Sequence, residues 1–224
     1  SLFFQCSQDK LLPIGYPRYD VMLKESPAGE RYIRQFKKDN DTKIIMWMPT
    51  YRKSTRAHLT ENTLDNRTDI PLLDSAEEIQ RLDEFCRKCH VVLILKRHHL
   101  ELDYVIKTKL ENIKIIDDSA LEDCHVRLYE ILQYTDALVT DYSSIAVDYL
   151  LLDKPIGFIL QDFEQYQKTR GFVFENPLDY MPGNHIYEMR QMKEFIKEIS
   201  SGEDSFASER QRVKQKMHTA VSSN

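Results

Sequence analysis

The chain has 224 residues, of which 42% are hydrophobic, and this is enough to build the core of one domain but not of two full ones. Its net charge of −5 argues against the general basic face that binds nucleic acid. No apolar run approaches the roughly 20 residues of a membrane span, and no signal peptide opens the sequence. We therefore expect a soluble, cytoplasmic domain with no nucleic-acid partner.

The first part of the chain is predicted to hold a short helix, an amphipathic helix over 30–38 and a strand from Ile44. After a proline, this strand is followed by Thr50 and Arg52, which offer a hydroxyl and a guanidinium at its carboxyl end. The polar stretch 53–71 has no periodicity and is predicted to be a long loop. Such a loop is either a lid over a site or plain disorder.

The middle of the chain repeats the pattern of a helix followed by a strand. A helix over 74–90 leads to a strand over 91–95, which runs straight into the basic segment 96–99. A helical piece over 101–110 and a strand over 113–116 come next. The basic segment is predicted to be a local anion site within an acidic protein.

Four cysteines, at positions 6, 86, 89 and 124, are too sparse for a disulfide framework, so free thiols are expected. Cys86, Cys89 and His90 have the spacing of a haem attachment site. The two cysteines also fall on an apolar stripe with Ile79 and Leu82, at helical spacing. Buried thiols therefore explain the pattern without haem or zinc.

The segment from Asp136 to Pro155 is the most informative one in the chain. It reads as a buried strand over 137–140, a turn, and a core-facing helix over 144–152. The first N–H groups of a helix have no backbone partners and carry partial positive charge. The turn therefore predicts a phosphate site beside Ser143 and Ser144, although serines at this position can also be simple helix caps.

Five predicted strands separated by helices indicate an α/β fold with a parallel, doubly wound sheet. Three of the predicted strands are followed, at their carboxyl ends, by side chains of the kind that bind phosphate. Open α/β sheets bind their ligands at this edge. A helix over 125–134 precedes the fourth strand, and a fifth strand covers 156–160. The region 184–224 is predicted to be a helical tail, with helices over 188–199 and 206–218.

Five motifs, in the same order, resemble those of the CDP-glycerol glycerophosphotransferases, the teichoic-acid primases and polymerases of bacterial cell-wall synthesis. Any one of these short motifs is weak evidence for the family, but the occurrence of all five in the same order is strong evidence. The likeness covers roughly positions 13–220 and implies one half of a GT-B fold, the carboxyl-terminal, Rossmann-like, nucleotide-binding half. The motifs are Gly-x-Pro-Arg-x-Asp at 15–20, Pro-Thr-x-Arg at 49–52, Lys-x-His at 96–98, the long segment 128–155, and Tyr…Arg-Gly-x-x-x-Glu…Pro-Gly at 166–183.

The resemblance implies that residues 1–224 form a single donor domain, a fragment of a larger two-domain enzyme. The acceptor half, with a histidine thought to act as general base, is then missing, and the isolated domain is expected to be inactive. The acceptor, a lipid-linked primer or a polymer, would bind through that half. The full-length protein could associate peripherally with the inner face of the bacterial membrane.

The chemistry implied by the resemblance is phosphoryl transfer from CDP-glycerol or CDP-ribitol to a hydroxyl of a teichoic-acid-like or capsular polymer, with release of CMP. Such a transfer depends on oriented positive charge around the phosphates. His98 is the expected catalytic residue and would donate to the bridging or leaving oxygen. His99 stands where the family has proline, which loosens the turn that presents His98. The diphosphate would be held by Ser143, Ser144, Thr50, Arg52 and Lys96.

Asp141, Arg18 and Asp148 are expected to support these residues. Asp141 could instead hold the backbone of its turn, Arg18 could brace the motif at 15–20, and Lys96 could be a solvated charge at the sheet edge. No cofactor and no metal is required on this view. Asp136, together with Asp141 and Asp148, leaves a weak Mg²⁺ option.

Two other classes of function stay open. The same architecture could serve a sugar-nucleotide glycosyltransferase, in which Ser143 and Ser144 would hold a UDP or CMP donor. It could also be a nucleotide-binding module that is inactive without its acceptor domain.

Overall fold

The structure of the chain is a computed structural model, which describes residues 7, 10, 15–50, 70–96 and 109–218. Arg52, His98 and His99 lie outside these residues. So do the predicted loop over 53–71 and the predicted helical piece over 101–110, apart from the last two residues of each.

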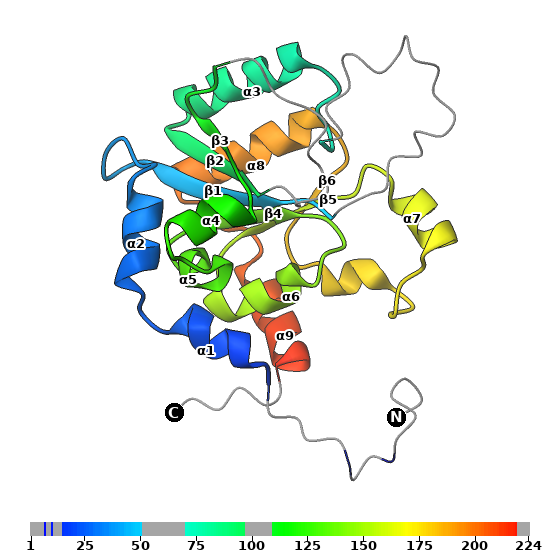
Figure 1. Cartoon of the computed structure of the whole chain (residues 1–224). Coiled ribbons are helices and arrows are strands. Elements are labelled where there is room, and N and C mark those ends of the chain that lie inside the picture. The colour runs from blue at the N-terminus through cyan, green and yellow to red at the C-terminus, as the bar shows by residue number, and fades with distance from the viewer. Residues whose placement is uncertain (1–6, 8–9, 11–14, 51–69, 97–108, 219–224) are drawn as a thin grey trace.

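Within the described residues, six parallel strands form one sheet in the order β3-β2-β1-β4-β5-β6 (Figure 1). The doubly wound parallel sheet predicted from the sequence is therefore confirmed. The order reverses between β1 and β4, which makes the gap between their carboxyl ends the topological switch point of the sheet. The strands are β1 Lys43–Met48, β2 Val91–Lys96, β3 Ile113–Ile116, β4 Ala137–Thr140, β5 Ile156–Ile159 and β6 Asn184–Ile186.

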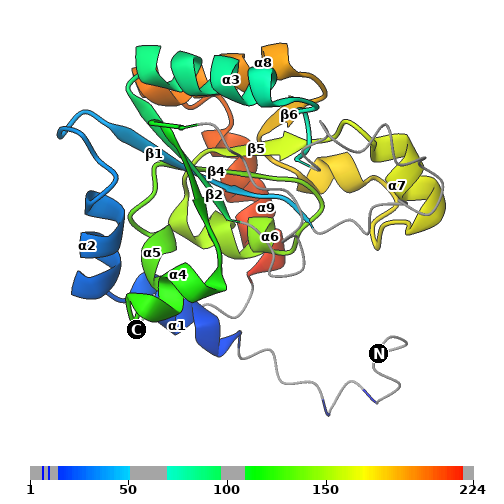
Figure 2. The same ribbon diagram turned by 45° about the horizontal axis from the view of Figure 1, so that its top comes forward.

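Helices cover both faces of this sheet (Figure 2). One face packs against α3 (Ala76–Lys88) and α8 (Met189–Ser201). The other face packs against a larger group of short helices, which continues with the 3₁₀ turn η4 (Leu150–Leu152). These helices are α1 (Pro17–Leu23), α2 (Pro27–Arg34), α4 (Asp118–Asp123), α5 (Leu128–Leu132), α6 (Ile145–Tyr149) and α9 (Ala207–Met217).

The strands are almost continuously apolar because both faces of the sheet are buried. In β1, Ile44 and Met46 contribute to the core on the α6 side, and Ile45 and Trp47 to the core on the α3 side. This alternation follows from the two-residue period of a strand. A further helix, α7 (Phe163–Thr169), follows β5 at the side of the fold, and the 3₁₀ turn η5 (Pro177–Tyr180) lies between α7 and β6.

The structure corrects the predicted helical tail over 184–224, because this region begins with the strand β6. β6 has only three residues, too few to show an alternating pattern, and it exists because it pairs with β5 from Gly157 to Ile159. The helices α4 and α7 were also not predicted. The helix predicted over 30–38 begins earlier, at Pro27, because the side chain of Ser26 accepts a hydrogen bond from the N–H of Gly29.

The cysteine prediction is confirmed for the described residues. Cys86, Cys89 and Cys124 are free thiols, and Cys86 is fully buried in the core beneath α3. Burial raises the pKa of the Cys86 thiol, which keeps it protonated and inert at neutral pH. None of the described helices has the length and hydrophobicity needed to cross a bilayer.

Candidate functional site

Two hydroxyl side chains join the carboxyl ends of β1 and β4 at the switch point. The hydroxyl of Thr140, the last residue of β4, donates to the carbonyl of Met48 at 2.7 Å. The backbone N–H of Thr50 donates to the two carboxylate oxygens of Asp141, at 3.1 and 2.9 Å. The Thr50 hydroxyl donates to the same carboxylate. The two strand ends are therefore fixed relative to each other where a ligand would bind.

Asp141 is only 1% exposed, and its carboxylate accepts from the N–H and the hydroxyl of Thr50, just beyond the end of β1. This geometry agrees with the predicted supporting role and with the alternative that Asp141 holds a backbone segment. The segment that it holds follows β1, and sequence reasoning did not anticipate this contact. Because a threonine hydroxyl has one hydrogen, and here Asp141 accepts it, Thr50 acts in this structure as part of the anchor.

The turn after Asp141 presents two serines at the start of α6. Ser143 is half-buried and Ser144 is exposed. The side chain of Ser144 makes no capping hydrogen bond, and the Ser143 hydroxyl lies a long 3.5 Å from the N–H of Ile145. Ordinary helix capping therefore explains neither hydroxyl well, and a hydroxyl that is not used by the helix is available to a ligand.

Tyr142 connects this turn to α7. Its hydroxyl donates to Asp162 at 3.0 Å, and its ring centroid lies 4.0 Å from that of Tyr166 and 5.4 Å from that of Phe172. Tyr166 and Phe172 belong to the last of the five motifs. This cluster was not predicted, although the tyrosine inside the serine turn and the aromatic residues of that motif were visible signals of packing.

Lys96 lies at the carboxyl end of β2 and pairs with Asp118 of α4 at 2.9 Å. The side chain of Lys96 is 9% exposed and that of Asp118 is 53% exposed, so the ion pair is open to solvent on one side only. Asp118 was not predicted as part of the site. A phosphate at this position would share the charge of Lys96 with that carboxylate.

Arg18 and Asp148 form a two-pronged ion pair between α1 and α6. The Nε and Nη2 atoms of Arg18 donate to the Asp148 carboxylate at 2.8 and 3.1 Å, and the hydroxyl of Tyr129 donates to it at 2.5 Å. The hydrogen bond with Asp148 raises the pKa of Arg18. Burial is the main cause that raises the pKa of the neighbouring Tyr19 to about 12.

This arrangement agrees with the alternative that Arg18 braces the motif at 15–20, and it extends the brace to α6. The aspartates named as a weak Mg²⁺ option do not converge. Asp136 accepts from the N–H of Ile44 at 2.7 Å, at the amino end of β1, whereas Asp141 binds beyond the carboxyl end of that strand. In the part of the chain that the structure describes, no group of three or more His, Cys, Asp or Glu could hold a metal ion.

Comparison with known protein families shows to which family the chain belongs. The family model described as CDP-Glycerol:Poly(glycerophosphate) glycerophosphotransferase matches residues 2–223. A match over nearly the whole chain shows that the chain belongs to this family, and the resemblance drawn from the five motifs is confirmed.

Individual relatives agree with this assignment. The teichoic acid ribitol-phosphate polymerase TarK of Staphylococcus aureus is 27% identical over 226 residues, which cover 92% of this chain and 40% of TarK. The teichoic acid glycerol-phosphate primase of Bacillus subtilis is 28% identical over 202 residues, which cover 84% of this chain and 43% of the primase. The chain therefore spans less than half the length of these relatives.

Among solved structures, the wall teichoic acid polymerase TagF matches the fold with a TM-score of 0.71 and 24% sequence identity. The match covers 97% of this chain and 50% of that chain. The predicted fold class, an α/β fold of the GT-B type with a parallel sheet, is therefore confirmed.

Proposed function

We propose that the chain binds the nucleotide-activated polyol, CDP-glycerol or CDP-ribitol, for a transferase that adds polyol phosphate to a hydroxyl of a teichoic-acid-type polymer. The family membership and the names of the relatives support this proposal, since they include both glycerol-phosphate and ribitol-phosphate enzymes. A TagF variant after a soak with CDPG also matches the fold, with a TM-score of 0.68.

The observation that carries the proposal is the anchored serine turn at the switch point. The hydrogen bonds from Thr50 to Asp141 fix the end of β1 against β4, immediately before Ser143 and Ser144. The side chain of Ser144 is exposed and makes no capping hydrogen bond, so its hydroxyl is available to a diphosphate at the start of α6. In our proposal Ser143 and Ser144 hold this diphosphate.

Two basic residues, one after β1 and one at the carboxyl end of β2, would supply the positive charge. We assign Lys96 and Arg52 to the diphosphate, whereas Thr50, Asp141, Arg18 and Asp148 position the elements that carry the site. Lys96 is held near the sheet edge by Asp118. Positive charge fixed in advance stabilises the charge that develops in phosphoryl transfer without reorganisation during the reaction.

In the proposed reaction, an acceptor hydroxyl oxygen attacks the β-phosphorus of the CDP-polyol, and the bond from that phosphorus to the bridging oxygen breaks. CMP leaves with the bridging oxygen, and His98 would donate a hydrogen bond or proton to it. The proton of the attacking hydroxyl passes to a base, which the family resemblance assigns to the acceptor half. The acceptor is then a polymer or lipid-linked primer at the cytoplasmic face of the membrane.

Calorimetric titration of the purified chain tests the proposal. CDP-glycerol and CDP-ribitol are titrated beside CMP and a UDP-sugar. Selective binding of a CDP-polyol is expected, because the polyol phosphate adds contacts that CMP lacks. Preference for the UDP-sugar would assign the chain to the sugar-nucleotide glycosyltransferases instead, and binding of none of the four would refute a donor site in this chain.

Ser144→Ala is expected to weaken CDP-polyol binding by about 1–2 kcal/mol, which is roughly 5- to 30-fold, because one hydrogen bond to a charged phosphate is lost. The melting temperature should stay close to that of the wild type, since the side chain makes no capping bond. Unchanged affinity with a lowered melting temperature would show that Ser144 serves the helix rather than the ligand.

His98→Ala is expected to lower turnover more than it lowers CDP-polyol affinity, in a protein that carries both halves of the fold. The reason is that His98 is proposed to act on the leaving oxygen, where charge develops only in the transition state. Steady-state kinetics and calorimetry on the same variant measure the two effects. Equal losses in turnover and in affinity would make His98 a binding residue without a catalytic role.

A further inference from the structure

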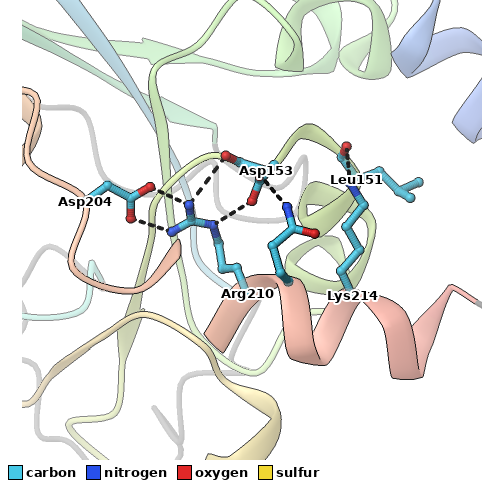
Figure 3. Close-up of polar contacts among 6 residues, drawn as sticks. Leu151, Asp153, Asp204, Arg210 and Lys214 are labelled. Carbon is cyan, nitrogen blue, oxygen red and sulfur yellow. Dashed lines mark hydrogen bonds and ion pairs between the residues drawn. The ribbon is translucent and has the colours of Figure 1, made fainter. Parts of the chain in front are cut away.

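Side chains of α9 contact Leu151 and Asp153 at the carboxyl-terminal end of η4 (Figure 3). η4 continues α6, which begins at the serine turn, so this is the opposite end of the continuous element α6–η4. Arg210 of α9 is 1% exposed. Its two terminal nitrogens donate to the Asp204 carboxylate at 2.7 and 2.5 Å, and one of them also donates to the backbone carbonyl of Asp153 at 3.4 Å. The Nε atom lies 3.5 Å from a carboxylate oxygen of Asp153.

Two further side chains, those of Lys214 in α9 and of His218 directly after it, reach backbone carbonyls of the same element. The ammonium of Lys214 donates to the carbonyl of Leu151 at 3.3 Å, and the Nε2 atom of His218 lies 2.7 Å from the carbonyl oxygen of Val147. The amide of Gln211 donates to the side chain of Asp153 at 2.6 Å. Arg210 and Lys214 are spaced by four, so they lie along one face of α9, and His218 follows as the residue that caps the helix.

These contacts supply hydrogen-bond donors to carbonyls at the end of a helix. The last carbonyls of a helix have no intrahelical partners and carry partial negative charge, so positively charged donors stabilise them. The element ends at Asp153, which has a left-handed backbone with φ of 52°. The two cations, Arg210 and Lys214, therefore bind this end of the element.

The charge of Arg210 is maintained although it is buried. Burial disfavours the charged form, but the hydrogen bonds and charges of Asp204 and Asp153 outweigh it, so the pKa of Arg210 is raised. The hydrogen bond from Arg210 likewise holds the pKa of Asp204 below its ordinary value. Lysine cannot reproduce these contacts, because only a guanidinium offers several donors in one plane.

We infer that α9 is a positioning clamp for the serine turn, and that Arg210 is the positioning residue on which the clamp depends. α6 has five residues and η4 has three, so the element that Arg210 holds at one end carries Ser144 at the other end, about two helical turns away. A shift at Asp153 is transmitted along this short, hydrogen-bonded element. The inference rests on the proposed function of the serine turn as a diphosphate site.

Arg210→Met tests the clamp. Asp204 and Asp153 have side chains that are 31% and 42% exposed, so both can be hydrated when the guanidinium is removed. We expect CDP-glycerol affinity to fall about 5- to 10-fold, measured well below the melting temperature, and amide hydrogen exchange at 143–148 to become faster in the ligand-free protein. Arg210→Lys should restore part of both losses, because it keeps the charge but not the planar contacts.

Arg212→Gln is the matched control. Arg212 is an exposed arginine of the same helix, and it donates to the carbonyl of Asp179 at 3.0 Å instead of to α6–η4. Arg212→Gln should leave both the CDP-glycerol affinity and the amide hydrogen exchange at 143–148 unchanged. If Arg210→Met does not fold, the partly buried Lys214 is replaced by glutamine, for which the same changes are expected at about 2-fold.

The outcomes separate the clamp from the proposed function. Wild-type affinity in Arg210→Met together with a lower melting temperature would overturn the clamp and leave a purely stabilising role. Unchanged hydrogen exchange at 143–148 would overturn it as well. If the wild type itself does not bind CDP-glycerol, the proposed function fails, and the exchange measurement alone still decides whether α9 holds the serine turn.

Discussion

Asp141→Ala is expected to weaken CDP-polyol binding at least tenfold and to lower the free energy of unfolding by about 2–3 kcal/mol. The variant removes the acceptor for the N–H and the hydroxyl of Thr50, and hydrogen bonds to charged groups contribute about 1.5–3 kcal/mol. The end of β1 is then released from β4, and the serine turn loses its support. Calorimetry at a temperature where the variant is folded measures the first effect, and urea unfolding measures the second.

Thr50→Val separates the two parts of this anchor. Valine keeps the shape of threonine and leaves the backbone N–H bonded to Asp141. Only the hydrogen bond from the hydroxyl is then lost, and the free energy of unfolding is expected to fall by about 1.5 kcal/mol, the lower end for a bond to a charged group. If Asp141→Ala lowers stability but binds the CDP-polyol with the affinity of the wild type, the serine turn is positioned without the anchor. In that case the switch-point geometry would no longer support the proposed site.

The longer strands of the fold could be predicted because strands that are buried on both faces have apolar residues at nearly every position. The runs at Ile44, Val91 and Ala137 are apolar at nearly every position, as expected for strands covered on both faces. β6 shows no such pattern, because a strand of three residues is defined by its ladder with β5. The order of the strands is a long-range property, which hydrophobic periodicity cannot show.

Some residues of the candidate site could likewise be predicted from the local sequence, and others depend on long-range contacts. Ser143 and Ser144 were predictable because a strand, a turn and a helix follow one another within one short segment. Their supports come from distant parts of the chain: Thr50 is 91 residues from Asp141, and Arg18 is 130 residues from Asp148. Resemblance to a family named some of these residues as supporting, but only the structure shows which residues pair.

Gly183 shows how a motif residue without a functional group can be required by the fold. This glycine belongs to the Pro-Gly pair of the last motif and precedes β6. A Cβ atom at this position would lie 1.9 Å from the carbonyl oxygen of Ile156 and 3.2 Å from the ring of Phe158. The nearest obstacle is the backbone of β5, which cannot move aside as a flexible side chain could. The close approach of the two segments is therefore possible only for glycine.

Gly183→Ala is accordingly expected to lower the free energy of unfolding by about 3 kcal/mol or more, at the upper end of what overpacking costs, because β6 must move away from β5. Gly202→Ala is the control, since Gly202 has φ of 78° and a Cβ atom there would meet nothing within 4 Å. It should cost only the strain of a left-handed backbone, about 1 kcal/mol. Urea unfolding of both variants gives the comparison, and equal losses would show that β5 and β6 are not held in this close contact.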